Sequence, residues 1–246
     1  MKKYLSMHRF VFVPIVLLIG MASMAGAAPL DVYSNNFDGT EVMSPGVTGG
    51  MGGSGGIESV QGYGSYGFSV NLWRNATVNP AGSTILSLNN LPAHDSVDIS
   101  FLLAFIDSWD SIDGTVTPDY FNVKVDGINV LQITANNQSG SVNYGGTLLT
   151  PVPRLDLGWN WRWGDQGFDM ANEPALFLAH TGNALSVEFF ASGAGWQGTS
   201  DESWGIENLK VTVNTTSTSV PEPATMLLFV TGIAGLAVTR LRRKRQ

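Results

Sequence analysis

Two groups of acidic residues are the first candidates for chemistry in this sequence. Asp107, Asp110 and Asp113 lie within seven residues, and a further acid, Asp119, follows them. Calcium binds six to eight oxygen atoms, and acidic loops supply such ligands. The spacing of three differs from the two-residue spacing of an EF-hand loop, so that motif is absent. The sequence therefore predicts a Ca²⁺ site at Asp107, Asp110 and Asp113, with a solvated acidic loop as the alternative.

The second acidic group combines residues from the two ends of the predicted domain. Asp201 and Glu202 are adjacent and precede the last predicted strand, whereas Asp38 follows the first. A cation bound by Asp38, Asp201 and Glu202 would join these strands in a chain that has no disulfide to do so. Ca²⁺ is the one cofactor that the sequence suggests, and ordinary solvated carboxylates are the alternative.

Alternating tryptophans form a third candidate site. Trp159, Trp161 and Trp163 occupy every second position, so an extended backbone places all three rings on one face. Sugar rings stack on such surfaces, and aromatic side chains offer a large apolar area at a small entropic cost. We expect a glycan-binding surface at these tryptophans. The competing interpretation is that they cap one end of the hydrophobic core.

Residues suited to catalysis are scarce. Of the three histidines, His8 falls in the N-terminal leader, which leaves His94 and His180. Gly52–Gly56 fits Gly-x-Ser-x-Gly by its letters, but it lies in a glycine-rich run with no helix pattern after it, so we predict no nucleophile elbow there. No two acids stand out as the pair that a glycosidase requires. We therefore expect no enzyme activity. The rival interpretation is a carbohydrate-active enzyme with Asp107, Asp110 and the tryptophans in its cleft.

The charge of the chain restricts its partners. Its 246 residues include 13 basic and 20 acidic ones, 29 glycines and no cysteine, and the isoelectric point is near 4.8. Between Ala28 and Val220 there are five basic and nineteen acidic residues, a net charge of −14. So acidic a domain is unsuited to DNA or RNA, and we expect no nucleic-acid partner. The lack of cysteine excludes disulfides, thiol catalysis and thiolate metal sites.

The elements that must position these residues are predicted to be strands. Residues 28–214 are expected to form one all-β domain, an antiparallel, jelly-roll-like β-sandwich, because short alternating segments are separated by Gly, Pro and Asn turns. Ser96–Ile106 becomes apolar on both faces, which indicates a central strand. Asp126-Gly127 predicts a hairpin turn. Met43–Gly67, with ten glycines, is predicted as a solvated surface loop. The other predicted strands are Ile57–Gln61, Ser83–Leu88, Phe121–Val125, Ile128–Thr134, Leu185–Phe189 and Leu209–Val213.

The N-terminus has the pattern of a secretory signal peptide over residues 1–27. Three basic residues in the first nine positions precede the apolar run Phe10–Gly20. Ala25 and Ala27 are the small residues that a signal peptidase requires, which places the cut after Ala27. The alternative, a permanent anchor, is disfavoured because the run is shorter than the ~20 residues of a membrane span.

The C-terminus has three parts that follow a Thr/Ser spacer at 215–219. The motif 220–223 contains Pro221-Glu222-Pro223, an uncharged apolar segment covers 224–239, and a basic tail covers 240–246. The apolar segment is predicted to form a single transmembrane helix, with the basic tail held in the cytoplasm. Sixteen residues span only about 24 Å as a helix, which is marginal for a permanent anchor.

This arrangement of Pro221-Glu222-Pro223, apolar helix and basic tail resembles the PEP-CTERM sorting signal, also catalogued as an ice-binding-protein C-terminal domain. The resemblance implies that the tail is the substrate of an exosortase in a Gram-negative bacterium that makes exopolysaccharide. It further implies export through the inner membrane, transient anchoring there, and a final place at the cell surface or in the extracellular matrix.

The predicted domain also resembles secreted bacterial jelly-roll domains of lectin-like or carbohydrate-module-like type. The matching segments are Phe37–Gly39, Leu91–His94, Ile106–Asp110, Ser192–Gly198 and Asp201–Leu209. We therefore expect a surface or matrix protein with a structural or adhesive role, with signal peptidase, exosortase and exopolysaccharide as partners. A glycan-binding lectin-like module is the alternative, and a carbohydrate-active enzyme is the less favoured one.

Overall fold

The computed structural model describes residues 28–110, 112, 117–134, 145–150, 155–160 and 164–215. Several predicted features therefore lie outside the described residues and stay predictions: the signal peptide with Ala25 and Ala27, the sorting tail with Pro221-Glu222-Pro223, and the side chains Asp113, Trp161 and Trp163. No helix in the described part of the chain is long and apolar enough to cross a bilayer. The described residues belong to one compact unit, Gly26–Thr216.

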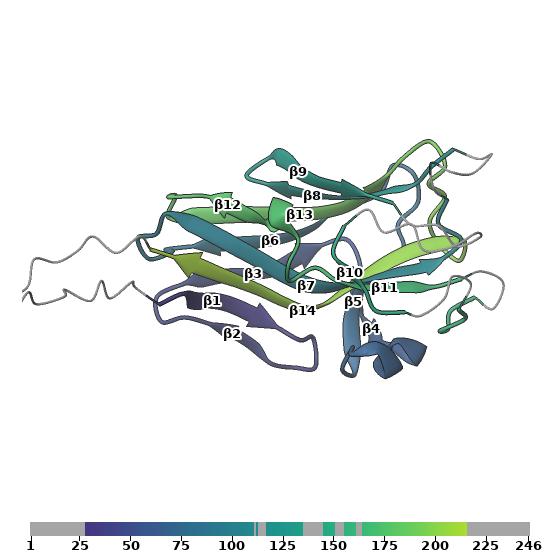
Figure 1. Cartoon of the computed structure of the whole chain (residues 1–246), viewed down its shortest axis with the longest axis horizontal. Coiled ribbons are helices and arrows are strands. Elements are labelled where there is room, and N and C mark those ends of the chain that lie inside the picture. The colour runs from purple at the N-terminus through teal and green to yellow at the C-terminus, as the bar shows by residue number, and fades with distance from the viewer. Residues whose placement is uncertain are drawn as a thin grey trace, which may run out of the picture. The chain divides into compact units, whose positions relative to one another are not determined.

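This unit is nearly all β, as predicted, and its described strands form two antiparallel sheets (Figure 1). The first sheet has the order β10-β11-β7-β14-β1-β2, with β12 beside β7, β5 beside β14, and β4 outside β5. Its strands are β1 (Leu30–Asn35), β2 (Glu41–Met43), β4 (Gly56–Ser59), β5 (Asn71–Asn75), β7 (Ser96–Asp107), β10 (Thr147–Leu148), β11 (Gln166–Asp169), β12 (Phe177–Ala179) and β14 (Glu202–Asn214).

The second sheet has the order β3-β6-β13-β8-β9. Its strands are β3 (Thr48–Gly53), β6 (Thr84–Asn89), β8 (Tyr120–Val125), β9 (Ile128–Ile133) and β13 (Ala184–Ser192). Two short 3₁₀ helices, η1 (Gln61–Tyr66) and η2 (Pro174–Leu176), are the only helices in the described ranges.

The two sheets pack face to face around an aromatic core. Phe101 of β7 contacts Phe189 of β13 with ring centroids 5.4 Å apart, and Phe121 of β8 contacts Trp204 of β14 at 5.1 Å. Along β13 the buried residues alternate with partly exposed ones, which is the period-two pattern that predicted the strand. The predicted strand at Ser96–Ile106 is confirmed as β7, which lies between β11 and β14.

A second, smaller core explains why β7 is apolar on both faces. Ala104 and Ile106 point away from the main core and pack with Tyr63, Phe68 and Leu72, which come from η1, the segment after it and β5. The chain from η1 to β5 therefore forms an additional layer on the outer face of the first sheet. This layer covers the end of β7 that leads into the acidic loop.

The first and last strands pair directly. β1 and β14 form an antiparallel ladder from Leu30↔Val213 to Asn35↔Leu209. Beyond a bulge between Glu207 and Lys210, the neighbour of β14 changes from β1 to β5. A backbone ladder thus makes the connection for which the sequence interpretation had invoked a cation at Asp38.

The glycine-rich stretch Met43–Gly67 is not a loop, so that prediction was wrong. It contains β3, β4 and η1. Gly49 has φ +142°, and a Cβ atom there would overlap the backbone oxygen of Ser87 in β6. Because glycine has no side chain, the edge strand β3 can approach β6 this closely. Amino-acid composition alone does not distinguish such a strand from a flexible segment. By contrast, the Asp126-Gly127 hairpin between β8 and β9 is confirmed, with positive φ at both turn residues.

Candidate functional site

Three acidic side chains converge at one end of the sandwich. Asp110 follows β7, Asp119 precedes β8, and Glu202 begins β14. Their carboxylate oxygens lie within 4.8 Å of one another. Asp119 and Glu202 are fully buried, whereas Asp110 is half-buried. The cluster therefore joins both sheets, because β7 and β14 belong to the first sheet and β8 to the second.

Backbone amides hold these carboxylates in place. The N–H of Asp110 donates to Asp119 Oδ2 at 2.8 Å, and the N–H of Asp119 donates to the carbonyl of Asp110 at 2.8 Å. The N–H of Gln197 donates to Glu202 Oε2 at 2.8 Å. The remaining oxygens, Asp119 Oδ1 and Glu202 Oε1, are buried and accept no hydrogen bond from a described N–H or O–H group.

The cluster is electrostatically strained. Burial, together with the carboxylates of Asp119 and Asp201, raises the pKa of Glu202 to about 8, although the hydrogen bond from the Gln197 amide opposes this rise. Burial likewise raises the pKa of Asp119 to about 7, with Asp110 and Asp201 adding to the effect. Burial also raises the pKa of Asp110. No ion pair within the described residues involves the three clustered acids.

Asp107 lies apart from this cluster and pairs with a different acid. Its backbone N–H donates to Asp165 Oδ1 at 2.7 Å, and Asp165 Oδ2 accepts from the N–H of Leu157 at 2.6 Å. Burial, followed by the charge of Asp165, raises the pKa of Asp107 to about 8, while Arg74 opposes this rise. Burial raises the pKa of Asp165 to about 7. Both side chains are at most 1% exposed.

The structure therefore groups the predicted cation ligands differently from the sequence interpretation. Asp110 and Glu202, assigned to separate sites, lie together, and Asp201 lies next to them, with its carboxylate accepting from Ser108 Oγ at 2.9 Å. Asp107 instead lies close enough to Tyr63 of the second core for its charge to raise the pKa of Tyr63. Strand alternation would give Asp107 the face of Phe105, but its φ of +67° ends the alternation.

Asp38 is also separated from its predicted partners. Its carboxylate accepts from Ser69 Oγ at 2.7 Å and from the backbone N–H of Asn71 at 2.8 Å. The same Ser69 hydroxyl lies 2.9 Å from Glu207 Oε1, so Asp38 faces the bulge of β14, five residues beyond Glu202 along the strand. The pairing of β1 with the distal half of β14 fixes this position.

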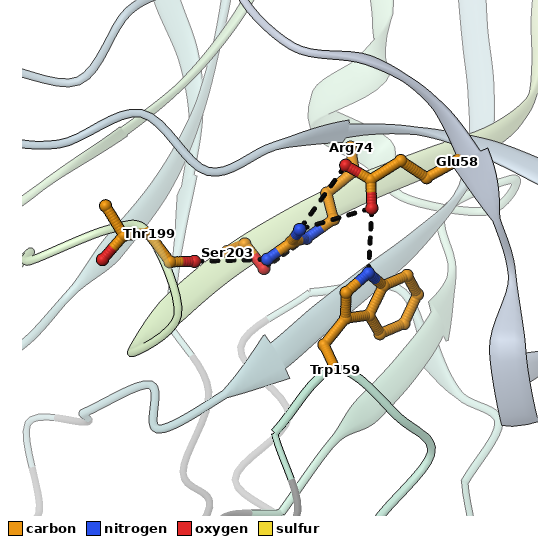
Figure 2. Close-up of polar contacts among 5 residues, drawn as sticks. All are labelled: Glu58, Arg74, Trp159, Thr199 and Ser203. Carbon is orange, nitrogen blue, oxygen red and sulfur yellow. Dashed lines mark hydrogen bonds and ion pairs between the residues drawn. The ribbon is translucent and has the colours of Figure 1, made fainter.

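Trp159 stands at the same end of the sandwich as the acidic cluster, in a half-exposed position. Figure 2 shows its indole N–H directed at Glu58 of β4, with Nε1 to Oε2 at 2.9 Å. The guanidinium of Arg74 lies 5.4 Å from the centroid of its ring, and the ring of Tyr63 lies 6.0 Å away on the second core. The backbone at Trp159 has φ +63°, which departs from the extended path that the sequence suggested.

Arg74 connects Trp159 to the loop that bears the acidic cluster. Its guanidinium forms an ion pair with Glu58 at 3.3 Å, donates from Nε to Ser203 Oγ at 2.8 Å and donates from Nη2 to the carbonyl of Thr199 at 3.2 Å (Figure 2). Asn160 Nδ2 donates to the carbonyl of Ser200 at 3.0 Å. The aromatic platform and the acidic cluster thus share the segment that leads into β14.

Sequence reasoning missed several residues of this region. Glu58 and Arg74 are separated by sixteen positions and approach Trp159 only because β4 pairs with β5. Asp165 gave no signal, because a lone acid in a polar stretch carries no spacing information. Asp119 had been noted after the acidic run but not assigned to a site.

A histidine pair was also missed. His94 Nε2 lies 2.6 Å from His180 Nδ1, the rings are stacked, and His180 Nε2 lies 3.1 Å from Asp126 Oδ2. His94 Nδ1 faces the carbonyl of Pro92 at 2.6 Å. The contact between His94 and His180 therefore links the loop before β7 to the loop before β13.

A groove of about 450 Å³ lies along β1 and the bulge of β14. Asn35, Asn208 and Lys210 contribute polar groups to its wall. The described acids predicted for cation binding and Trp159 do not line this groove.

Residues 219–244 match the PEP-CTERM protein-sorting motif. The match confirms the resemblance drawn from Pro221-Glu222-Pro223 and the segments that follow. The motif indicates that the chain is an exosortase-sorted extracellular protein, exported and transiently anchored in the membrane before surface display. No curated protein matches the chain.

Three solved structures are similar to this chain at low identity. The Agl-KA catalytic domain has 10% identity and a TM-score of 0.33, and the match covers 84% of this chain and 31% of that chain. The CBM22-1 xylan-binding domain of Paenibacillus barcinonensis Xyn10C has 12% identity and a TM-score of 0.30, and the match covers 80% of this chain and 100% of that domain. The infectious bursal disease virus Gt strain structure has 14% identity and a TM-score of 0.28, and the match covers 74% of this chain and 35% of that chain. The chain thus spans about a third of the first and third of these structures.

Proposed function

We propose that this protein is an adhesive component of the cell surface or exopolysaccharide matrix of a Gram-negative bacterium, and that its β-sandwich binds glycan at the platform around Trp159. Signal peptidase removes residues 1–27 and exosortase acts at the tail. Intact-mass measurement of the surface-released protein tests the processing: a released form that retains the C-terminal basic tail contradicts it.

The observation that carries the glycan proposal is the setting of Trp159. Its half-exposed ring provides an apolar face, and the side chains of Glu58, Arg74 and Asn160 surround it with hydrogen-bonding groups. Sugars present both an apolar ring face and a rim of hydroxyls, so an aromatic ring edged by polar groups matches their chemistry. The contacts of Arg74 hold the platform rigid, which lowers the entropic cost of binding.

Binding is favoured over cleavage by the burial of the nearby acids. Asp107 and Asp165 beside the platform are at most 1% exposed, and Asp119 and Glu202 are fully buried. A glycosidase requires two carboxyl groups that reach the scissile bond of its substrate. A glycan resting on Trp159 would meet Glu58, which is partly exposed, but none of the buried acids. We therefore propose a lectin-like role without catalysis.

The test compares Trp159→Ala with Trp159→Phe and a matched control, Phe177→Ala. Phe177 is 57% exposed on β12 and lies far along β7 from the platform, opposite Asp98. We expect Trp159→Ala to weaken binding to the host's own exopolysaccharide about tenfold or more, as for a central aromatic contact. Trp159→Phe keeps an apolar face and should lose less, and the control should bind as the wild type does.

Affinity electrophoresis measures the binding, and thermal unfolding is followed in parallel. If Trp159→Ala lowers the free energy of unfolding by about 3–5 kcal/mol, as the loss of a core tryptophan does, the ring serves to pack the core and the proposal fails. Unchanged binding in Trp159→Ala also rejects it.

A further inference from the structure

Asp119 and Glu202 form a pair of buried carboxyl groups within the acidic cluster. Asp119 and Glu202 each have one oxygen bound to a backbone N–H, and in each the second oxygen is buried without a described donor. One carboxylate oxygen from each of Asp110, Asp119 and Glu202 lies within 4.8 Å of the other two. A buried carboxylate oxygen without a donor is costly unless something compensates its charge.

Among the described residues, the surroundings of the pair supply more negative charge and no basic side chain. The groups that raise the pKa values of Asp119 and Glu202 are burial and the neighbouring acids, Asp110 and Asp201 among them. The ion pairs within the described residues all lie elsewhere. The compensating charge is therefore not one of the described side chains.

Packing around the pair has a specific shape. Gly195, in the loop before β14, lies so close that a Cβ atom there would stand 2.9 Å from Asp119 Oδ1 and would overlap the carbonyl oxygen of Thr117. The same loop donates the Gln197 N–H to Glu202. The loop thus packs its backbone directly against the cluster.

We propose that Asp110, Asp119 and Glu202 bind one divalent cation of the Ca²⁺ class, which joins the end of β7 to the starts of β8 and β14. The donor set consists of carboxylate oxygens without histidine or cysteine, which suits a hard cation such as Ca²⁺ rather than a zinc-type metal. Half-buried Asp110 leaves the outer side open to water, which would complete the coordination. Extracellular Ca²⁺ modules bind with dissociation constants of about 10⁻⁴–10⁻³ M, and an exported protein meets such concentrations.

The test is a calorimetric titration of the full chain, kept in mild detergent after treatment with chelator, at constant ionic strength. We expect one Ca²⁺ per chain. At a hundredfold excess over the dissociation constant, the unfolding temperature should rise by about 5–10 °C for a domain of this size. Chelator should reverse the rise.

Two substitutions separate a cation site from a pair of carboxyl groups that merely share a proton. Glu202→Gln should abolish the response to Ca²⁺ and unfold in chelator at the same temperature as the wild type or higher, because its amide can donate to Asp119 Oδ1. If that variant does not fold, Asp110→Asn at the half-buried rim should still weaken Ca²⁺ binding. The matched control is Asp31→Asn, at the opposite end of β14, which should respond as the wild type does.

Two results overturn the proposal. The first is a wild-type transition that Ca²⁺, Mg²⁺ and Mn²⁺ at about 10 mM all leave unchanged, well above the expected dissociation constant. The second is a response to Ca²⁺ that persists in both Glu202→Gln and Asp110→Asn, which would place the ion elsewhere on this acidic chain.

Discussion

The two ends of the β7–β14 strand pair differ in how they handle charge. At the end formed by Ser96 and Asn214, acids face cationic or titratable partners: Asp31 with Lys210 at 3.6 Å, and Asp126 with His180 at 3.1 Å. At the end formed by Asp107 and Glu202, six carboxyl groups gather, and the one described cation that offsets any of them is Arg74, which acts against the raised pKa of Asp107. The six are Asp107, Asp110, Asp119, Asp165, Asp201 and Glu202.

This difference is our reason for proposing ligand sites at one end of an otherwise regular sandwich. Both ends are covered by backbone hydrogen bonds and close packing, so a need for stability alone does not explain why one end buries acids. Burying charge without a partner lowers stability, and proteins keep such arrangements where a ligand or a reaction uses them. The acidic end is also the end that bears the Trp159 platform, and the two features share the segment Thr199–Ser203.

The largest expected effect comes from the tryptophan beneath the acidic end. Trp109 is 1% exposed, its Nε1 donates to the carbonyl of Ser203 at 2.7 Å, and its ring packs on Phe105 and Trp196. Trp109→Ala should lower the free energy of unfolding by about 3–5 kcal/mol. Trp109→Phe, which retains an aromatic ring, should lose less.

Chemical denaturation of both variants measures this. If Trp109→Ala lowers the free energy of unfolding by less than about 1 kcal/mol, the packing of Trp109 does not stabilise the acidic end as we expect. The buried Trp109 and the half-exposed Trp159 would then not differ in their contribution to stability.

A smaller effect is expected from pH. Burial raises the pKa of Asp107 to about 8 and that of Asp165 to about 7, whereas an unfolded chain has aspartate pKa values near 3.9. The folded state therefore holds protons that the unfolded state has already lost. The contribution of these groups to stability is fully present below pH ~4 and is lost as the pH rises through about 7–8.

We expect the free energy of unfolding, measured in chelator, to fall by more than about 1 kcal/mol between pH 5 and pH 8.5. Asp107→Asn should flatten this decline, because its amide does not titrate. The Asp31–Lys210 pair at the other end is exposed and should add little. Stability that rises with pH over this range would contradict the assignment.

The sequence predicted the parts of the fold that depend on local pattern. Alternation identified β8, β13 and β14, and the two-sided apolar run identified β7 as central. Glycine was misread in β3, because composition cannot distinguish a flexible segment from an edge strand that approaches its neighbour closely.

The candidate sites were predicted residue by residue rather than as groups. Asp110 and Glu202 were chosen for their acidity and position in the sequence. Their proximity to Asp119, however, depends on the register of β7 with β14 and on the packing of β8 against that strand pair. Contacts between distant positions leave no periodic signal in one sequence. Arg74 and Glu58 were invisible for the same reason, since only β-pairing brings them to Trp159.

The central claim is that ligands act at the acidic end of the sandwich, and hydrogen exchange tests it most directly. Amide exchange of the full chain is followed by mass spectrometry with and without Ca²⁺ and the host exopolysaccharide. We predict slower exchange in the segments around Asp107–Asp110, Pro118–Tyr120, Leu157–Asn160 and Gly193–Ser203, and no change around Leu91–Val97 or His180–Ser186. Protection confined to the latter two segments, or no protection at all, would contradict the account.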